Sequence, residues 1–180
     1  MPRFSPTELA GRAKQISLLV LDVDGVLTDG RIVYADGGSE LKQFHVRDGS
    51  GLKFWRESGN RAAIISGRAS SAVDRRAKEL GVGPVIQGSS DKSAALDEVL
   101  KTLGVWPQQV CAIGDDLPDL PMLRRCGLAV TVADACREVR AAADYVTQLP
   151  GGHGAVREAI EWLLTLKGQW GDVVKQYTEK

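Results

Sequence analysis

The sequence predicts an α/β protein with a mainly parallel sheet and helices on both faces. Short apolar runs rich in β-forming residues alternate along the chain with segments that repeat apolar residues at helical spacing. Such alternation is typical of βα units, whose crossover helices cover the faces of a parallel sheet. The 180 residues, 43% of them hydrophobic, are enough for one domain with a sizeable core.

The first half of the chain contains strands, a hairpin and helices with clear boundary signals. The apolar run 16–22 predicts a buried strand, and Ala35-Asp36-Gly37-Gly38 between two short β-forming runs predicts a hairpin turn. A glycine follows each of two expected helices, as helix ends favour. We expect strands at 16–22, 31–34, 40–44, 62–65 and 84–87, and helices at 49–58 and 69–80.

The second half continues the same alternation. Apolar residues at helical spacing mark 91–103 as an amphipathic helix, and Val110 to Ile113 is a short apolar run that predicts a buried strand. We expect further helices at 118–125, 135–142 and 154–167, a strand at 128–132 and a short edge strand at 145–146. The predicted elements therefore form a βα series throughout.

Composition and the ends of the chain limit the function classes. The net charge is zero, so we expect no nucleic-acid partner and no membrane surface as a partner. Residues 1–14 are polar and lack a signal-peptide core, and three cysteines without a close pair favour a reduced cytoplasm. We divide the chain into an N-terminal extension, 1–15, a domain, 16–167, and a polar tail, 168–180, either disordered or docked on a neighbour.

The most informative motif is Asp22-Val23-Asp24-Gly25-Val26, which follows the first strand. Alternate residues of an extended segment point the same way, so the two carboxyl groups can serve one substrate. A carboxylate such as Asp22 can attack phosphorus and form an aspartyl phosphate. Asp24 can then protonate the leaving oxygen and later take a proton from water. The motif therefore favours phosphoryl transfer.

Three further signals lie at or near other predicted strand ends. Ser66 and the Gly67 amide can donate hydrogen bonds to a phosphate oxygen, and Lys92 adds a positive charge at a helix start. Asp115 and Asp116 offer the oxygen ligands that Mg²⁺ prefers. Taken alone, each motif is also compatible with turn capping or a solvated charge. Their succession at one sheet edge, where open α/β sheets bind ligands, predicts a magnesium-dependent phosphotransfer site.

These four motifs resemble those of the haloacid dehalogenase-like phosphatase superfamily. The resemblance rests on Asp22-Val23-Asp24-Gly25-Val26, Ser66, Lys92, and Gly114-Asp115-Asp116 with Asp119. It implies an HAD-like, Rossmann-like fold, with Asp22 as nucleophile, Asp24 as acid/base, and Ser66 and Lys92 holding the phosphoryl group. It also implies Mg²⁺ on the Asp22 side chain, the Asp24 backbone carbonyl and the Asp115 side chain, with Asp116 and Asp119 in the outer shell.

The spacing of the motifs identifies the chain as similar to capless members of this superfamily. The 22-to-66 segment has room only for a small β-hairpin flap and one helix, and the 66-to-92 segment for a helix and a short strand. Capless relatives of this size are typically homotetramers whose hairpins and chain termini complete neighbouring sites. We therefore expect a homotetramer with shared sites.

Further segments resemble the subfamily that hydrolyses 3-deoxy-D-manno-octulosonate 8-phosphate in lipopolysaccharide biosynthesis. These include Ile64-Ile65-Ser66-Gly67-Arg68 and Gly151-Gly152-His153-Gly154. The resemblance implies that 151–154 belongs to a mobile tail that closes a site. Arg68 suits the substrate carboxylate because its fork is bidentate. The residues implied to line the substrate site are His45, Val46, Arg47, Asp48, Gly49, Arg68, Arg76 and Lys92.

Three alternatives stay open at this point. A phosphatase of a nine-carbon keto-deoxy sugar acid 9-phosphate is the closest, although Arg68 favours the eight-carbon acid because the nine-carbon group tends to carry an acid there. A non-catalytic oligomerisation module of the same fold is the second. A phosphorylated switch domain is the third, and Asp24 argues against it because a switch needs no acid/base.

Overall fold

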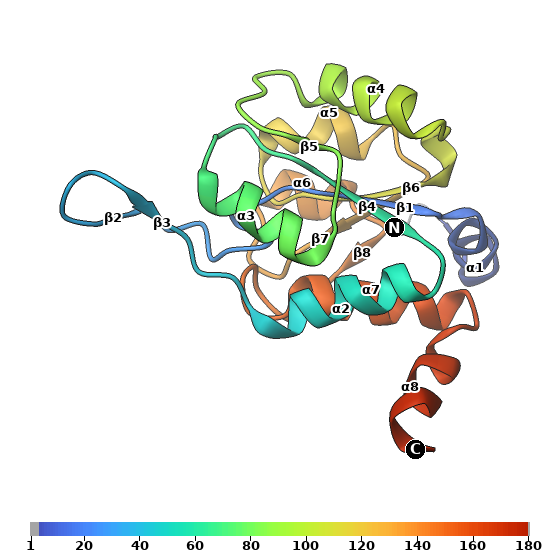
Figure 1. Cartoon of the computed structure of the whole chain (residues 1–180). Helices are drawn as coiled ribbons and strands as arrows, with labels where there is room; N and C mark the ends of the chain where they lie inside the picture. The colour runs from blue at the N-terminus through green and yellow to red at the C-terminus, as the bar shows by residue number, and fades with distance from the viewer. Residues whose placement is uncertain (1–3, 180) are drawn as a thin grey trace.

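The computed structural model describes residues 4–179 and contains a six-stranded parallel sheet (Figure 1). The strand order is β5-β4-β1-β6-β7-β8, so β1 lies near the centre and β8 is an edge strand, as predicted. The strands are β1 (Leu18–Leu21), β4 (Arg61–Ile65), β5 (Val85–Ile86), β6 (Val110–Ile113), β7 (Leu128–Thr131) and β8 (Tyr145–Val146). The predicted α/β class with a parallel sheet is confirmed.

Helices cover both faces of this sheet. One face packs against α1 (Pro6–Gln15), α2 (Val46–Glu57), α3 (Ser71–Leu80) and α7 (Ala155–Leu166). The other packs against α4 (Lys92–Leu103), α5 (Leu120–Leu123) and α6 (Arg137–Ala142). The expected helix 118–125 is instead a short 3-10 turn, η2 (Leu117–Asp119), followed by α5; a second 3-10 turn, η1 (Pro107–Gln109), precedes β6.

Alternation along each strand divides the core into two layers. In β1, Leu19 and Leu21 pack with Trp55 of α2, whereas Leu18 and Val20 pack with Leu96 of α4. All four β1 residues are buried, because a central strand between two helical layers has no solvent face. The core therefore fixes β1, and with it the position at which the chain leaves the sheet after Leu21.

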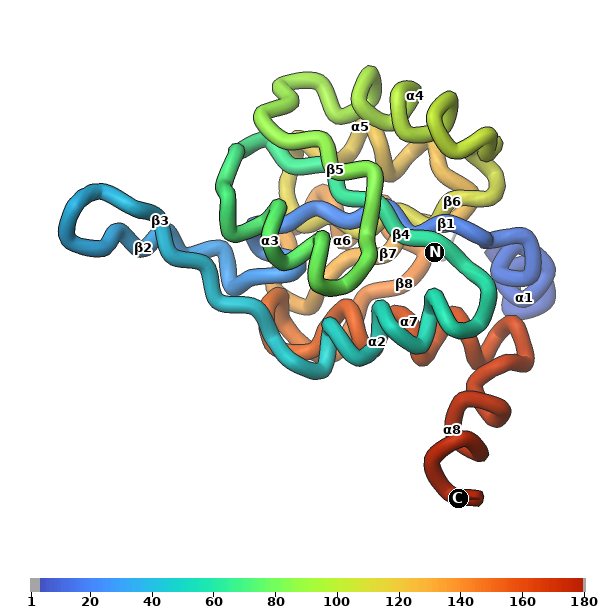
Figure 2. The backbone as a smooth tube through the Cα atoms, viewed as in Figure 1, coloured from blue at the N-terminus to red at the C-terminus, as the bar shows by residue number. Residues whose placement is uncertain are grey.

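The expected hairpin is present and projects away from the body of the molecule (Figures 1 and 2). It consists of β2 (Val33–Tyr34) and β3 (Glu40–Leu41), which pair antiparallel. Between Asp22 and Ser66 the described chain adds to the sheet strand β4 only this hairpin and α2, as expected for a capless member. Its apolar residues Ile32, Val33, Tyr34 and Leu41 are all exposed.

Both ends of the described chain form helices that were not predicted from the sequence. Ser5 caps α1 through a capping box with Glu8, and Ala13 of α1 is fully buried. The polar tail forms α8 (Trp170–Thr178), which extends from the end of α7. It contacts its own chain, because Trp170 packs against Phe54 of α2 at a centroid distance of 6.2 Å. The tail is thus ordered and docked on the same molecule.

Candidate active site

The carboxyl ends of three neighbouring strands bring the predicted motifs together. Leu21 of β1 is in register with Ile64 of β4 and Ile113 of β6. The residues that follow these positions therefore leave the sheet at one edge. They include Asp22, Ser66 and Asp115, so the predicted convergence of these motifs is confirmed.

Lys92 connects two of the acids. It is the first residue of α4, and its Nζ lies 2.7 Å from Oδ1 of Asp22 and 2.5 Å from Oδ1 of Asp119. Burial alone would lower the pKa of Lys92, but the neighbouring carboxylates outweigh it and raise the pKa. Lys92 is therefore a buried, charged group, and Asp119 binds it directly.

Three carboxylates form a compact group beside Lys92. Asp22, Asp115 and Asp119 each offer an oxygen, and these atoms lie within 4.8 Å of one another. Burial raises the pKa of Asp22 to about 6, with Lys92 opposing and Asp119 adding to the rise. Burial and repulsion from Asp22 and Asp119 raise the pKa of Asp115 to about 8. Such crowding of hard oxygen donors fits a divalent cation such as Mg²⁺.

Gly25 makes the approach of Asp115 feasible. Its φ is +89°, and a Cβ at this position would lie 2.1 Å from Oδ2 of Asp115. The turn after Asp24 therefore requires a residue without a side chain, both for its left-handed backbone and for the space. This glycine lets the carboxylate that ends β6 lie against the turn that ends β1.

Asp119 and Asp116 play different structural parts. Oδ2 of Asp119 accepts hydrogen bonds from the backbone N–H groups of Asp115 (2.9 Å) and Asp116 (3.1 Å), and Asp119 is buried. Asp119 therefore shapes the loop that carries Asp115 while its other oxygen binds Lys92. Asp116 is exposed and starts the η2 turn.

Ser66 and Gly67 form the turn between β4 and α3. Ser66 is buried, and its Oγ accepts a hydrogen bond from the Arg68 amide at 3.3 Å. Its backbone is held from two sides, since its N–H donates to Ile86 and its carbonyl accepts from Ser89. The turn is therefore fixed at the sheet edge, and a Cβ on Gly67 would meet only the Ser89 carbonyl at 3.7 Å.

Sequence reasoning predicted Arg68 at the substrate site but missed Lys42 and Glu40. Lys42 contacts Asp24, and Glu40 contacts both Lys42 and Arg68. Oδ1 of Asp24 accepts from the ammonium of Lys42, and Oδ2 lies 3.8 Å from Nε of Arg68. Nη2 of Arg68 donates to Oε2 of Glu40 at 2.5 Å. A sequence signal existed, because Glu40 and Lys42 alternate on an extended segment as Asp22 and Asp24 do.

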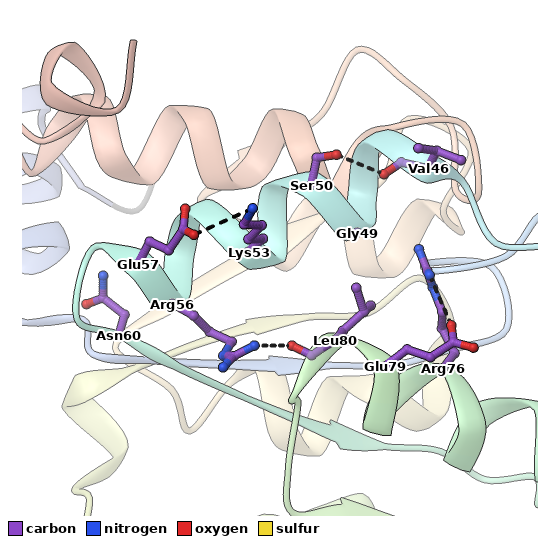
Figure 3. A pocket seen from close by; sticks show the side chains of 10 residues that line it. All are labelled: Val46, Gly49, Ser50, Lys53, Arg56, Glu57, Asn60, Arg76, Glu79 and Leu80. Atoms are coloured by element: carbon purple, nitrogen blue, oxygen red, sulfur yellow. Dashed lines mark hydrogen bonds and ion pairs between the residues drawn. The ribbon is translucent and has the colours of Figure 1, made fainter. Parts of the chain in front are cut away.

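Three of the residues predicted to line the substrate site share a groove. Figure 3 shows Val46, Gly49 and Arg76 lining a groove of about 650 Å³ between α2 and α3. Arg76 pairs there with Glu79 at 3.3 Å, and a Cβ on Gly49 would lie 2.4 Å from Nη2 of Arg76. The structure thus groups these three residues along one groove.

Asp48 has a structural partner. Its side chain is buried in the first turn of α2, and Oδ1 accepts a hydrogen bond from the Arg157 amide at 2.8 Å, at the start of α7. Burial raises the pKa of Asp48, although the hydrogen bonds from the α7 amides oppose the rise. His45 is half-buried beside Gly154, and Arg47 is exposed and lines a cavity with residues of α7.

The loop 151–154, expected to be part of a mobile tail, packs against the turn that follows Asp24. The Gly152 amide donates to the Val26 carbonyl at 3.0 Å, and the Gly151 amide donates to Asp134. A Cβ on Gly151 would lie 1.7 Å from the carbonyl oxygen of Gly25. These glycines therefore support the turn after Asp24 from behind.

Comparisons with known proteins agree with this geometry. Residues 84–160 match the model of the haloacid dehalogenase-like hydrolase family. The 3-deoxy-D-manno-octulosonate 8-phosphate phosphatase of Escherichia coli K12 is 44% identical, over 90% of this chain and 86% of that protein.

Solved structures give the same result. The Moraxella catarrhalis phosphatase of the same name, determined with magnesium, phosphate and 3-deoxy-D-manno-octulosonate, has a TM-score of 0.92 and 44% identity, covering 95% of this chain and 98% of that one. The cobalt-bound Haemophilus influenzae protein has a TM-score of 0.85 and 39% identity, covering 88% and 93%. The chain therefore belongs to the haloacid dehalogenase-like hydrolase family and is one of its phosphatases.

Proposed function

We propose that this phosphatase hydrolyses 3-deoxy-D-manno-octulosonate 8-phosphate to the free sugar acid and phosphate, as a step of lipopolysaccharide biosynthesis. The observation that carries the proposal is the buried contact of Lys92 with Asp22, at the edge where Asp115 and Ser66 also lie. It joins a nucleophilic carboxylate to a cation suited to a phosphoryl group. The 44% identity to named phosphatases of this substrate supports the same conclusion.

Magnesium is the cofactor that this donor set fits. We assign it to the side chains of Asp22 and Asp115 and the backbone carbonyl of Asp24, with Asp116 and Asp119 supporting the outer shell. The raised pKa of Asp115, about 8, supports the assignment because crowded carboxylates need a cation or protons. When bound, Mg²⁺ would shield the repulsion between these carboxylates and the phosphate.

The first half of the reaction uses Asp22 and Asp24. An oxygen of the Asp22 carboxylate attacks phosphorus while the bond from phosphorus to the sugar oxygen breaks. The leaving oxygen keeps the bonding electrons and takes a proton from the Asp24 carboxyl group. Lys92, the Ser66 hydroxyl and the Gly67 amide hold the phosphoryl oxygens. The product is the free sugar acid and a phosphate ester on Asp22.

The second half restores the enzyme. Asp24, now a carboxylate, takes a proton from water as the water oxygen attacks phosphorus. The bond from phosphorus to the Asp22 oxygen breaks, and inorganic phosphate leaves. Burial raises the pKa of Asp22 only to about 6, so its carboxylate is ionised again at neutral pH.

Arg68 is the residue that we assign to the carboxylate of the sugar acid, in its own or a neighbouring subunit. It follows the phosphate-binding turn, and its side chain is 42% exposed. We assign the remaining contacts to His45, Val46, Arg47, Asp48, Gly49 and Arg76. The groove that Val46, Gly49 and Arg76 share supports their grouping as one surface.

A homotetramer with shared sites is the assembly that we propose. Its support is the projecting hairpin, on which Tyr34 is 68% exposed and Leu41 52%. Exposed apolar patches of this kind mark protein interfaces. Sedimentation of the full chain tests this, because a monomer would leave the hairpin uncovered.

The proposed location is the cytoplasm. The three cysteines form no disulfide in the described chain, as a reducing compartment favours. No helix among the described residues has the length and apolar character required to cross a membrane.

The test is phosphate release in the presence of Mg²⁺ from the eight-carbon and nine-carbon keto-deoxy sugar acid phosphates, side by side. Preference for the eight-carbon substrate, abolished by Asp22→Asn and kept by the exposed control Asp172→Asn, is the expected result. Equal rates on the two substrates would be consistent with phosphatase activity but would overturn the assignment of the eight-carbon substrate. If neither substrate gave phosphate release that depends on Asp22, the result would favour a non-catalytic module.

A further inference from the structure

Four charged side chains form a closed ring at the base of the hairpin. Lys42 contacts Asp24 on one side and Oε1 of Glu40 on the other, at 2.9 Å. The second oxygen of Glu40 binds Arg68 at 2.5 Å, and Arg68 returns to Asp24 at 3.8 Å. Positive and negative groups alternate around the ring, so each carboxylate faces two cations. The ring joins β3 to the turns after β1 and β4.

Lys42 is the most enclosed member of this ring. Its side chain is only 2% exposed, compared with 21% for Asp24, 16% for Glu40 and 42% for Arg68. Its ammonium is paired with a carboxylate oxygen of Asp24 and with Oε1 of Glu40. A buried ammonium without its paired carboxylates would be an uncompensated charge, which costs a large free energy. Lys42 therefore holds Oδ1 of Asp24 in place.

We propose that Lys42 is a positioning residue for Asp24, and that Glu40 anchors it from the hairpin. This inference rests on the acid/base role of Asp24 in the proposed function. When Asp24 gives its proton to the leaving sugar oxygen, a negative charge develops on its carboxyl group. The ammonium of Lys42 already lies against that group, so it stabilises the charge without rearrangement.

The leaving group distinguishes this role from a merely structural one. A sugar alkoxide is a poor leaving group and requires the proton of Asp24 as the ester bond breaks. A 4-nitrophenolate ion is stable in water and leaves without one. Since proton transfer by a positioned acid contributes about 10²–10⁴-fold, its loss affects mainly the first substrate.

The experiment compares wild type and Lys42→Met on two substrates with Mg²⁺: 3-deoxy-D-manno-octulosonate 8-phosphate and 4-nitrophenyl phosphate. We expect kcat for the sugar phosphate to fall by about 10²-fold, and kcat for the aryl phosphate by less than about 5-fold. Lys42→Arg, which keeps a cation, should recover part of the loss. The matched control is Lys14→Met, an exposed lysine of α1.

A double variant, Glu40→Gln with Lys42→Met, separates positioning from charge balance. It removes one acid and one base, so the ring keeps its net charge and the variant carries the same test if Lys42→Met does not fold. We expect the same selective loss for the sugar phosphate. Equal losses on both substrates, or recovery of sugar phosphate turnover in the double variant, would overturn the inference alone. A wild type inactive on both substrates would overturn the proposed function and this inference with it.

Discussion

The ammonium of Lys92 lies between two buried carboxylates, and this position links catalysis to stability. Lys92 is 7% exposed, and its partners Asp22 and Asp119 are similarly buried. Removing one partner of a buried ion pair leaves the other charge without compensation. Lys92 therefore offsets the repulsion between these two neighbouring carboxylates.

We expect Lys92→Met to lose both activity and stability. The free energy of unfolding should fall by about 3 kcal/mol because Asp22 and Asp119 remain buried without their cation. For a chain of this size, that corresponds to a drop in Tm of about 6–12 °C. Phosphatase activity should fall at least about 10²-fold, because the variant lacks the charge that we propose holds the phosphoryl group.

Thermal melts and steady-state rates at pH 8 check this prediction, with the exposed Lys101→Met of the same helix as control. At pH 5 the stability loss should shrink, because burial already raises the pKa of Asp22 to about 6 and loss of Lys92, which lowers that pKa, raises it further, so that Asp22 takes a proton instead. An unchanged Tm at pH 8 would contradict the account of Lys92 as a compensating charge.

At this scale the sequence predicted residues that follow strands and missed residues that reach in from loops. Asp22 and Ser66 directly follow buried strands and Asp115 follows one after Gly114, so the fold class alone places them at one edge. Lys42 directly follows β3 of the hairpin, and nothing local shows that its side chain is buried against Asp24. Only the path of the hairpin back to the sheet determines that contact.

At the scale of elements, α2 supplies a side chain that caps the start of α7. The residue before α7 is Gly154, which has no side chain with which to cap the first amides. The carboxylate of Asp48 in α2 caps the helix instead, because it accepts a hydrogen bond from the Arg157 amide. Because the loop 151–154 supports the turn after Asp24, this cap also helps to hold that turn in place.

Asp48→Ala should therefore destabilise the protein by about 1–2 kcal/mol, the range for loss of a helix N-cap. Chemical denaturation without substrate measures this directly. The control is Asp172→Ala, an exposed acid in the first turn of α8 that should change stability by less than about 0.5 kcal/mol. Equal effects of the two variants would show that Asp48 contributes nothing as a cap.

Periodicity identified the elements of the sheet but not the terminal helices. The segment 6–15 is polar on most sides, and only its start signal, Ser5 with Pro6 and Glu8, predicts a helix. The helix α8 depends on Phe54 and Trp170 meeting across more than a hundred residues. Helix α2 begins at Val46, three residues before the predicted start, where no side chain caps it.

At the scale of the whole molecule, the fold concentrates negative charge at one sheet edge although the net charge is zero. Burial is the main reason that the pKa values of Asp22 and Asp115 rise, to about 6 and about 8. In the unfolded chain both groups would titrate near 3.9. Between these values the folded protein binds more protons than the unfolded one, so its stability must fall as pH rises through this window.

A divalent cation should reverse that dependence. Without metal, we expect Tm to fall from pH 5.5 to pH 8. Glu40 and Asp97, whose pKa values are lowered by their hydrogen bonds, stay ionised in this window and add no slope. Mg²⁺ binds the deprotonated carboxylates, so at 100 times its Kd it should add about 2.7 kcal/mol, or about 5–10 °C, at pH 8. At pH 5.5 protons compete, and the shift should be smaller.

Melts in EDTA and in Mg²⁺ at both pH values measure this linkage, and Asp115→Asn is its control. That variant cannot ionise at position 115, so it should lose part of the pH slope in EDTA and most of the Mg²⁺ shift at pH 8. The explanation depends on competition between protons and metal at the same oxygens. A Mg²⁺ shift of equal size at pH 5.5 and pH 8, or one retained in Asp115→Asn, would therefore place the metal away from these carboxylates.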